Sequence, residues 1–148
     1  MASIDVVDSI RINAQPEDVY AVIADYANIT AWLPIYRCTL RDTDCIAEGV
    51  EVEHRYGYPP FVLSSFTRRI DAMVAGKRLE ESYIDGAMLG TGIWNFEAEG
   101  DQTIASYHCK VEANNLMTKV VFTLNGAKAH SNTYQTLLKA LQRHCEST

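Results

Sequence analysis

The segment Leu116–Cys145, LMTKVVFTLNGAKAHSNTYQTLLKALQRHC, decides the fold of this chain. Its apolar residues return every three or four positions, with one longer gap at Ser131, as they do on one face of an α-helix. About 30 residues at a rise of 1.5 Å give a rod of about 45 Å. A helix of this length with one apolar stripe needs a sheet to pack against. The stripe consists of Leu116, Val120, Leu124, Ala127, Tyr134, Leu138, Leu141 and Cys145.

The first half of this segment also has a second interpretation. Residues 119–123 are rich in β-branched side chains and lead into Asn125-Gly126, which is also the pattern of a strand and a hairpin turn. We favour the helix because the apolar period continues across this region and because Asn114-Asn115 offers an N-cap. Gly126 is then a weak point or a kink. The half from Ser131 onward is the more secure helix.

The chain before this helix is mostly strand and turn. Ile4–Ile12 alternates as a strand, and a short helix begins at Pro16, a residue that suits the first helical position. A second short helix at 29–33 is stopped by Pro34. Connections as short as those that follow join antiparallel neighbours, which predicts a seven-stranded antiparallel sheet. The six further strands are expected near 35–43, 49–57, 61–73, 77–85, 91–99 and 102–112.

Length and charge limit the function classes. The 148 residues fit one domain, and we expect a single unit over 1–148. The 13 basic and 19 acidic residues give a net charge of −6, which disfavours a nucleic-acid partner and favours a monomer or a weak homodimer. The N-terminus lacks the pattern of a signal peptide, and no apolar run is long enough to span a bilayer. We therefore expect a cytoplasmic protein without integral membrane association.

No established metal, cofactor or catalytic motif occurs. The four cysteines lack CxxC spacing, so reduced structural thiols are the favoured interpretation. The four histidines lie far apart in the sequence, and neither HxH nor HExxH spacing joins them to another ligand. A GxSxG elbow, a P-loop and a dinucleotide fingerprint are also absent. We therefore expect neither a metal site nor a cofactor.

Alternation along the predicted strands places one set of side chains on the inner face of the sheet. This set is mostly apolar but contains hydroxyls, one imidazole and one carboxylate. An unpaired buried polar group costs about 1–3 kcal/mol, so these groups must meet each other, water or a ligand. A mainly apolar cavity with a few polar groups is typical of a site for a hydrophobic small molecule. The expected cavity residues are Val52, His54, Tyr56, Glu81, Tyr83, Trp94, Phe96, Tyr107 and Leu138.

Several of these residues also have a purely structural interpretation. Trp94 and Phe96 fit a wall or a core, and His54 fits a hydrogen-bonded structural histidine as well as a general base. Glu81 has either a raised pKa or a cationic partner, for which Arg68 is the candidate. Of the neighbours Arg68 and Arg69, one side chain points inward, and the sequence leaves open which one.

Five short stretches form a pattern that runs through nearly the whole chain: Ile10–Tyr26, Trp32–Pro34, Asp85–Ala87, Gly92–Phe96 and Thr103–Tyr107. In this order they resemble the START-related superfamily called SRPBCC, and within it the polyketide cyclase/dehydrase and coenzyme Q-binding branch. The chain departs from the coenzyme Q-binding pattern near 85–92, where it is shorter by one residue and carries Ala87 instead of proline.

The resemblance implies an α+β helix-grip fold, which is START-like and birch-pollen-allergen-like. In this fold the antiparallel sheet wraps around the C-terminal helix and leaves a cavity between them. The superfamily hosts carriers, cyclases, hydrolases, chaperone activators and toxins, so the fold by itself assigns no function.

We expect a protein that binds or transports a lipid, a quinone or a polyketide-like aromatic in this cavity. The alternative is an enzyme of the polyketide aromatase/cyclase type, in which Glu81, His54, Tyr56 and Arg68 are the candidates for moving protons. A third interpretation is a toxin-like interaction protein that acts on ribosomes, and the negative charge disfavours it.

Overall fold

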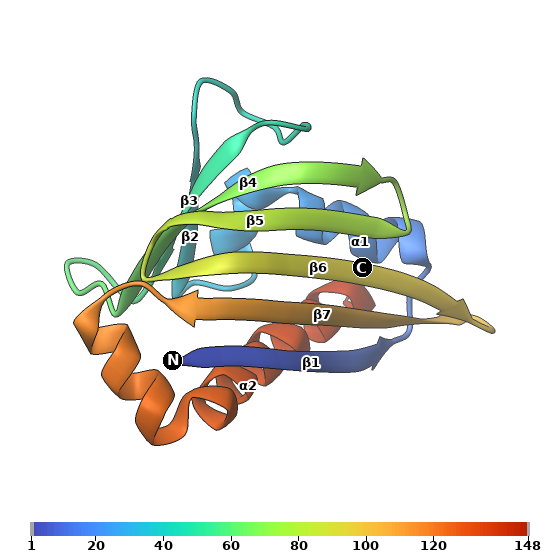
Figure 1. The fold of residues 1–148 in the computed structure, drawn as a ribbon. Coiled ribbons are helices and arrows are strands. Elements are labelled where there is room, and N and C mark those ends of the chain that lie inside the picture. The colour runs from blue at the N-terminus through green and yellow to red at the C-terminus, as the bar shows by residue number, and fades with distance from the viewer. Residues whose placement is uncertain (1, 148) are drawn as a thin grey trace.

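The computed structural model describes residues 2–147, and its main feature is one curved sheet of seven antiparallel strands. The strand order is β1-β7-β6-β5-β4-β3-β2, so the chain crosses from one edge of the sheet to the other after β1 and then returns strand by strand (Figure 1). The strands are β1 (Ser3–Ile12), β2 (Tyr36–Leu40), β3 (Glu51–Tyr56), β4 (Ser64–Val74), β5 (Arg78–Gly86), β6 (Met88–Glu99) and β7 (Gln102–Ala113).

The crossing from β1 to β2 is made by two short helices, α1 (Pro16–Ala24) and η1 (Tyr26–Ala31), the second of which is a 3-10 helix. As predicted, Pro16 occupies the start of α1, and Glu17 and Asp18 follow in the first turn, where the helix dipole favours acidic residues. The long C-terminal helix is α2 (Leu116–Glu146). The structure thus has the predicted helix-grip architecture.

One stretch that was predicted to open a strand is a loop instead. β3 ends at Tyr56, and Tyr56 pairs with Ser64, the first residue of β4. Residues 57–63 therefore have no strand opposite them, and they form an exposed loop in which Phe61 and Leu63 point to solvent. The apolar sequence at 61–63 was misleading because apolar character alone does not provide a pairing partner.

The helix α2 begins and bends where the sequence suggested. The side chain of Asn115 caps the helix by accepting a hydrogen bond from the backbone N–H of Thr118 at 2.9 Å. At Asn125 the backbone leaves helical geometry, with φ −162° and ψ 31°, next to the predicted weak point at Gly126. Residues 116–124 form what we call the first half of α2, and residues 126–146 form the second half.

The predicted apolar stripe of α2 is buried in the second half alone. Leu138 and Leu141 are completely buried there. In the first half the stripe was wrongly placed against the sheet: Leu116 and Leu124 are 78% and 80% exposed, and Val120 is also exposed. Ala127, near the start of the second half, is exposed as well. The kink reorients the helix, so the side chain of the first half that packs against the core is Phe122.

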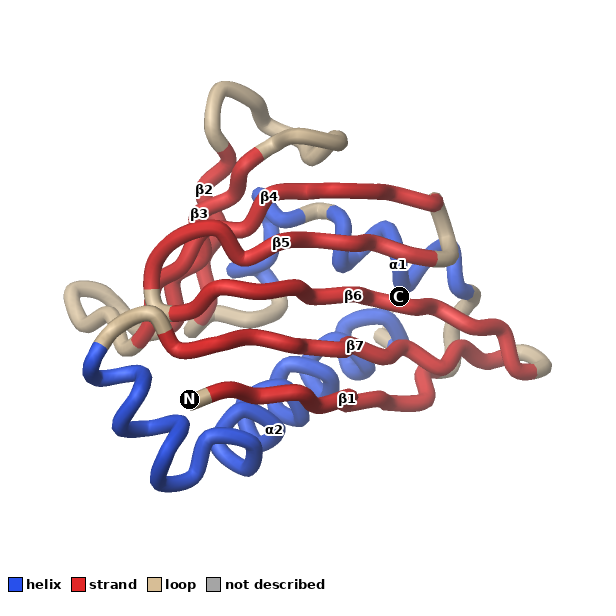
Figure 2. The backbone as a smooth tube through the Cα atoms, viewed as in Figure 1, coloured by secondary structure: helices blue, strands red, loops and turns tan. Residues whose placement is uncertain are grey.

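The hydrophobic core lies between the inner face of the sheet and the second half of α2, with α1 closing one end (Figure 2). Six strands and helices besides α2 contribute fully buried members, and examples are Ile12, Val19, Val52, Ile70, Leu79, Tyr107, Leu138 and Leu141. The core ends near the kink, and the space beyond it is not completely filled. No helix within residues 2–147 is long and apolar enough to cross a membrane.

Candidate functional site

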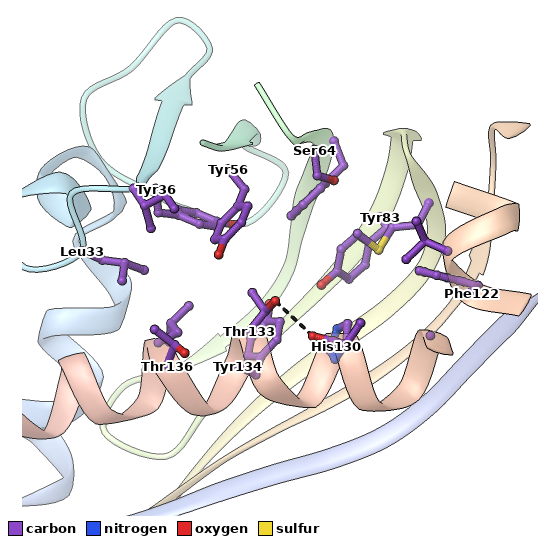
Figure 3. Close-up of a pocket in the computed structure, with 17 residues that line it drawn as sticks. Leu33, Tyr36, Tyr56, Ser64, Tyr83, Phe122, His130, Thr133, Tyr134 and Thr136 are labelled. Atoms are coloured by element: carbon purple, nitrogen blue, oxygen red, sulfur yellow. Dashed lines mark hydrogen bonds between the residues drawn. The ribbon is translucent and has the colours of Figure 1, made fainter. Parts of the chain in front are cut away.

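A cavity of about 190 Å³ lies between the inner face of the sheet and α2, beside the kink (Figure 3). An apolar cavity of about 150 Å³ accommodates benzene, so this space has room for one substituted ring in the present conformation. The cavity is lined by Leu33, Ile35, Tyr36, Tyr56, Ser64, Phe66, Tyr83, Met88, Val121, Phe122, Gly126, Ala129, His130, Thr133, Tyr134, Thr136 and Leu137.

The lining offers few polar groups to a ligand. The hydroxyls of Thr133 and Thr136 donate to backbone carbonyls one turn earlier in α2, at 3.1 and 3.0 Å, so their donor capacity is used within the helix. Among residues 2–147 the hydroxyls of Tyr56 and Ser64 have no hydrogen-bond partner, and both residues line the cavity. The cavity is therefore mainly aromatic and aliphatic, with a small number of polar positions.

Next to the cavity a completely buried ion pair joins β4 to β5. Nη1 of Arg68 lies 2.9 Å from Oε2 of Glu81, and the hydroxyl of Tyr26 in η1 donates to Oε1. No N–H of Arg68 points along the line to Oε2, so within the described residues this oxygen accepts no hydrogen bond. The contact is therefore electrostatic rather than a well-directed hydrogen bond. The carboxylate keeps one oxygen whose hydrogen-bonding capacity is unused.

Burial and charge act in opposite directions on this pair. Desolvation raises the pKa of the Glu81 carboxyl, and the charge of Arg68 offsets part of that rise. Burial by itself would lower the pKa of Arg68, but Glu81 and the neighbouring tyrosines raise it well above its ordinary value, so the guanidinium stays charged. Four rings also lie 5.3 to 5.8 Å from the guanidinium carbon and form cation-π contacts with it. They belong to Tyr26, Phe66, Tyr83 and Tyr107.

His54 in β3 is held as a neutral hydrogen-bonded side chain. Nε of Arg68 donates to Nε2 of His54 at 3.1 Å, and Nη2 of Arg68 lies 3.0 Å from Nδ1, which also lies 2.7 Å from the Tyr36 hydroxyl. Burial, together with the charge of Arg68, lowers the pKa of His54 well below its ordinary value. Both ring nitrogens of His54 therefore have partners at neutral pH.

Two tyrosines connect this polar network to the cavity. Tyr36 and Tyr83 line the cavity, and their hydroxyls reach His54 and the hydroxyl of Tyr107, respectively. Nη1 of Arg68 donates to the Tyr107 hydroxyl at 2.8 Å. Burial raises the pKa of both lining tyrosines well above the ordinary value, so they remain protonated. Hydroxyl groups thus join the cavity wall to the buried ion pair.

On the opposite wall, α2 contributes His130. Its ring stacks on Tyr134 with centroids 4.7 Å apart, and among residues 2–147 its Nδ1 is buried without a hydrogen-bond partner. Burial lowers the pKa of His130 to about 4, although the nearby carboxylate of Asp8 opposes the shift. His130 is therefore neutral at pH 7 and adds a weakly polar ring to the wall.

The family of the chain follows from a comparison of its sequence with family models. The model described as "Polyketide cyclase / dehydrase and lipid transport" matches residues 3–146, which is almost the whole chain. The chain belongs to this polyketide cyclase/dehydrase and lipid transport family. Together with the fold, the match places it in the SRPBCC superfamily. No curated protein is significantly similar in sequence.

Solved structures with the same fold are distant in sequence. TTHA0849 from Thermus thermophilus superimposes with a TM-score of 0.75 at 17% identity, covering 97% of this chain and 98% of that one. The Zhui aromatase/cyclase from Streptomyces sp. R1128 gives 0.74 at 12% identity, with coverages of 97% and 94%. Norcoclaurine synthase from Thalictrum flavum, in complex with dopamine and hydroxybenzaldehyde, gives 0.69 at 10% identity, with coverages of 95% and 85%. At these identities the likeness establishes the fold alone.

In this member of the polyketide cyclase/dehydrase family, the predicted site residues fall into three groups. Tyr56 and Tyr83 line the cavity. His54, Arg68, Glu81 and Tyr107 form the buried network beside it, and the predicted pairing of Arg68 with Glu81 is confirmed. The remaining residues are buried in the core and do not line the cavity, and contact between them and a ligand stays a prediction: Val52, Trp94, Phe96 and Leu138.

The sequence analysis missed the side of α2 that lines the cavity. These residues lie beside the apolar stripe and recur at helical spacing, but they include a glycine, a histidine and threonines, so hydropathy alone does not mark them. The available signal was the spacing of small and polar residues on one helical face. The missed residues are Val121, Phe122, Gly126, Ala129, His130, Thr133, Thr136 and Leu137, whereas Tyr134 of the predicted stripe does line the cavity.

The histidines, cysteines and acids do not form a metal site in the part of the chain that the structure describes, since no three of them lie close enough together. Cys38, Cys45 and Cys109 form no disulfide within residues 2–147. Burial raises the pKa of the Cys109 thiol to about 11, so this thiol is not activated as a nucleophile.

Proposed function

We propose that this protein binds and carries a hydrophobic small molecule, such as a lipid, a quinone or a polyketide-like aromatic, in the cavity between the sheet and α2. The observation that carries the proposal is the cavity itself: aromatic and aliphatic side chains line it, and the space is not filled by the core. A well-packed core leaves few voids larger than a water molecule, so an apolar pocket of this size fits a bound ligand better than it fits ordinary core packing.

The chemistry of the lining favours a neutral ligand with a ring. The buried charged groups beside the cavity wall, Arg68 and Glu81, neutralise each other in the adjacent network. Tyr56, Ser64 and His130 remain as polar positions for one or two hydroxyl or carbonyl groups of the ligand. Two structural neighbours support this choice, since one is an aromatase/cyclase and the other was solved with two small aromatic molecules.

Native mass spectrometry of the protein purified from its natural source tests the proposal. We expect a population that carries one additional small molecule, which organic extraction then releases and identifies. Protein that is homogeneous at the mass of the bare polypeptide, and that takes up none of a panel of lipids, quinones and aromatic polyketides, would overturn the proposal.

An enzyme of the aromatase/cyclase type is the second candidate function. It is favoured by one specific observation, which is that Tyr36 and Tyr83 join the cavity wall to the buried network. Hydroxyls held in such a network are able to transfer protons to a reacting carbonyl, and the carboxylate of Glu81 belongs to the same network through its ion pair with Arg68, which donates to Tyr83.

The enzyme candidate is tested with a synthetic linear poly-β-ketone as substrate. Tyr83→Phe removes the hydroxyl and keeps the ring, so turnover should be lost while affinity for the substrate is retained, and Glu81→Gln and His54→Ala should have the same effect. A wild-type protein that binds the polyketone but never alters it would refute the enzyme candidate and would leave the carrier intact.

A further inference from the structure

Exposed apolar side chains gather at one end of the molecule. Nine residues form what we call the rim, and they come from two segments that lie far apart in the sequence: the loop between β3 and β4, and the first half of α2 (Figure 1). These segments meet at the cavity, because Tyr56 and Ser64, which flank the loop, line it together with Val121 and Phe122. The rim consists of Tyr58, Phe61, Val62, Leu63, Leu116, Met117, Val120, Val121 and Leu124.

The helical part of the rim is a continuous apolar face without cover. Its five residues recur at intervals of one, three and four positions, which places them on one side of the helix. The packed side chain Phe122 lies on another side. An amphipathic helix normally turns its apolar face toward the protein, whereas this one turns it toward solvent. A contiguous exposed apolar patch marks an interaction surface.

The two segments that form the rim carry no acidic residue. No aspartate or glutamate occurs between residues 113 and 145, and residues 57–63 carry no charge, although the whole chain has a net charge of −6. Lys119 and Lys128 are exposed on α2 beside the rim. Glu112, at the end of β7, lines one groove together with Lys119 and Phe122, so Lys119 has one acidic neighbour. The rim thus combines an apolar surface with basic side chains.

We propose that the rim docks on the surface of a bilayer that contains anionic lipids. Apolar side chains of an interfacial helix enter the boundary between headgroups and acyl chains, and flanking lysines contact lipid phosphates. The combination of these two features on an acidic protein selects this partner over a second copy of the chain. A symmetric pair of rims would bring the lysines of both copies into one interface, and neither rim segment would supply an acidic residue to pair with them.

Docking in this orientation would place the cavity against the membrane. Val121 belongs to the rim and also lines the cavity, so the opening and the docking surface are continuous. A hydrophobic ligand then passes between bilayer and cavity without crossing water. This consequence rests on the proposed carrier function, whereas the docking itself does not.

Flotation with lipid vesicles tests the docking. We expect the ligand-free protein to float with vesicles of phosphatidylcholine and phosphatidylglycerol, and to bind weakly to vesicles of phosphatidylcholine alone. Leu116→Glu/Leu124→Glu should weaken binding at least about tenfold, because it removes two apolar side chains from the interface and adds negative charge. Lys119→Glu/Lys128→Glu should weaken binding to the anionic vesicles at least about fivefold for each lysine. High salt should also weaken the binding of wild type to these vesicles, because it screens the attraction between lysines and lipid phosphates.

The matched controls carry the same chemical changes away from the rim. Val7→Glu/Val74→Glu replaces two other exposed apolar residues, and Lys77→Glu/Lys139→Glu reverses two other exposed lysines. Both should bind vesicles nearly as wild type does. An equal loss in controls and rim variants, or no vesicle binding by wild type, would overturn the proposal.

Two further outcomes separate this inference from related ideas. If Leu116→Glu/Leu124→Glu converts a dimer into a monomer and leaves vesicle binding unchanged, the rim is an interface between two copies and the proposal is wrong. Ala129→Trp, which fills the cavity, should retain vesicle binding even where ligand binding is lost. Failure of the carrier function is thereby distinguished from failure of the docking.

Discussion

Arg68 organises the buried polar groups of this protein. Its guanidinium contacts the carboxylate of Glu81, a ring nitrogen of His54 and the hydroxyl of Tyr107, so one side chain ties together strands β3, β4, β5 and β7. A buried charge of this kind is stable only while its partners remain. The network therefore links these four strands beside the cavity through buried polar contacts.

Replacing Arg68 tests this role. Arg68→Met leaves Glu81 buried without its cation, and we expect a loss of about 3–5 kcal/mol in the free energy of unfolding, measured by urea denaturation. The double variant Arg68→Met/Glu81→Met removes both charges and should recover most of that loss. The control is Arg69→Met at the neighbouring exposed position, which should change stability by less than about 1 kcal/mol. Equal losses at positions 68 and 69 would contradict this account.

His130 makes stability depend on pH. Its pKa is about 4 in the folded protein and about 6.5 when the chain is unfolded, so the unfolded state binds the additional proton between these values. Stability is therefore expected to fall as the pH is lowered from about 6.5 to about 4. The free energy of unfolding should be measured by urea denaturation at pH 7 and at pH 4.5. Between these two pH values His130→Gln should lose about 2 kcal/mol less of it than wild type does. Parallel losses in both proteins would be inconsistent with a buried neutral His130.

At the level of single residues, the sequence identified the sheet side of the site better than the helix side. Alternate residues of a strand lie on the same face of the sheet, so the spacing of two residues sufficed to predict the inner face. The residues placed correctly on that face are His54, Tyr56, Glu81 and Tyr83. The orientation of Arg68 rather than Arg69 depended on the strand register, which the sequence did not settle. His130 was missed because polar residues beside an apolar helical stripe are usually solvated.

Among the elements, α2 shows what periodicity predicts and what it does not. The spacing of apolar residues correctly predicted a helix from Leu116 and a weak point at Gly126. It did not predict what covers the apolar face, because an interruption of the helix at Asn125 changes the direction in which the first half points. The stripe is continuous in sequence but is divided in the structure between core and solvent.

The two halves of α2 should differ in stability. The second half is packed into the core through Leu138 and Leu141, whereas the first half is attached mainly through Phe122. Hydrogen exchange measured by mass spectrometry or NMR should therefore show strong protection at 131–145 and faster exchange at 116–124. Uniformly strong protection from Leu116 to Cys145 would contradict this difference between the two halves.

At the scale of the whole molecule, the fold was predictable and the ligand was not. The order of strands and helices and the motifs around Pro16, Trp94 and Tyr107 match one superfamily, and each element has its own local signal. A ligand is selected by the volume and polarity of a cavity, which depend on how side chains from several elements meet. The family also includes both enzymes and transporters in its description, so membership does not choose between them.

The central claim is that the cavity beside the kink of α2 is the binding site. Ala129 lines this cavity, whereas Ala127 is exposed on the same helix, so tryptophan at these two positions makes a matched pair. Circular dichroism should first show that Ala129→Trp stays folded, because overpacking costs about 1–3 kcal/mol, and Ala129→Leu is the milder alternative.

The decisive measurement is calorimetric titration of wild type and both variants with phenol, naphthol and anthrol, three aromatic alcohols of increasing size. We expect wild type and Ala127→Trp to bind the one- or two-ring compounds with equal affinity, and Ala129→Trp to bind them at least about tenfold more weakly. Undiminished affinity in a folded Ala129→Trp protein, or no binding of any compound by wild type, would contradict the account.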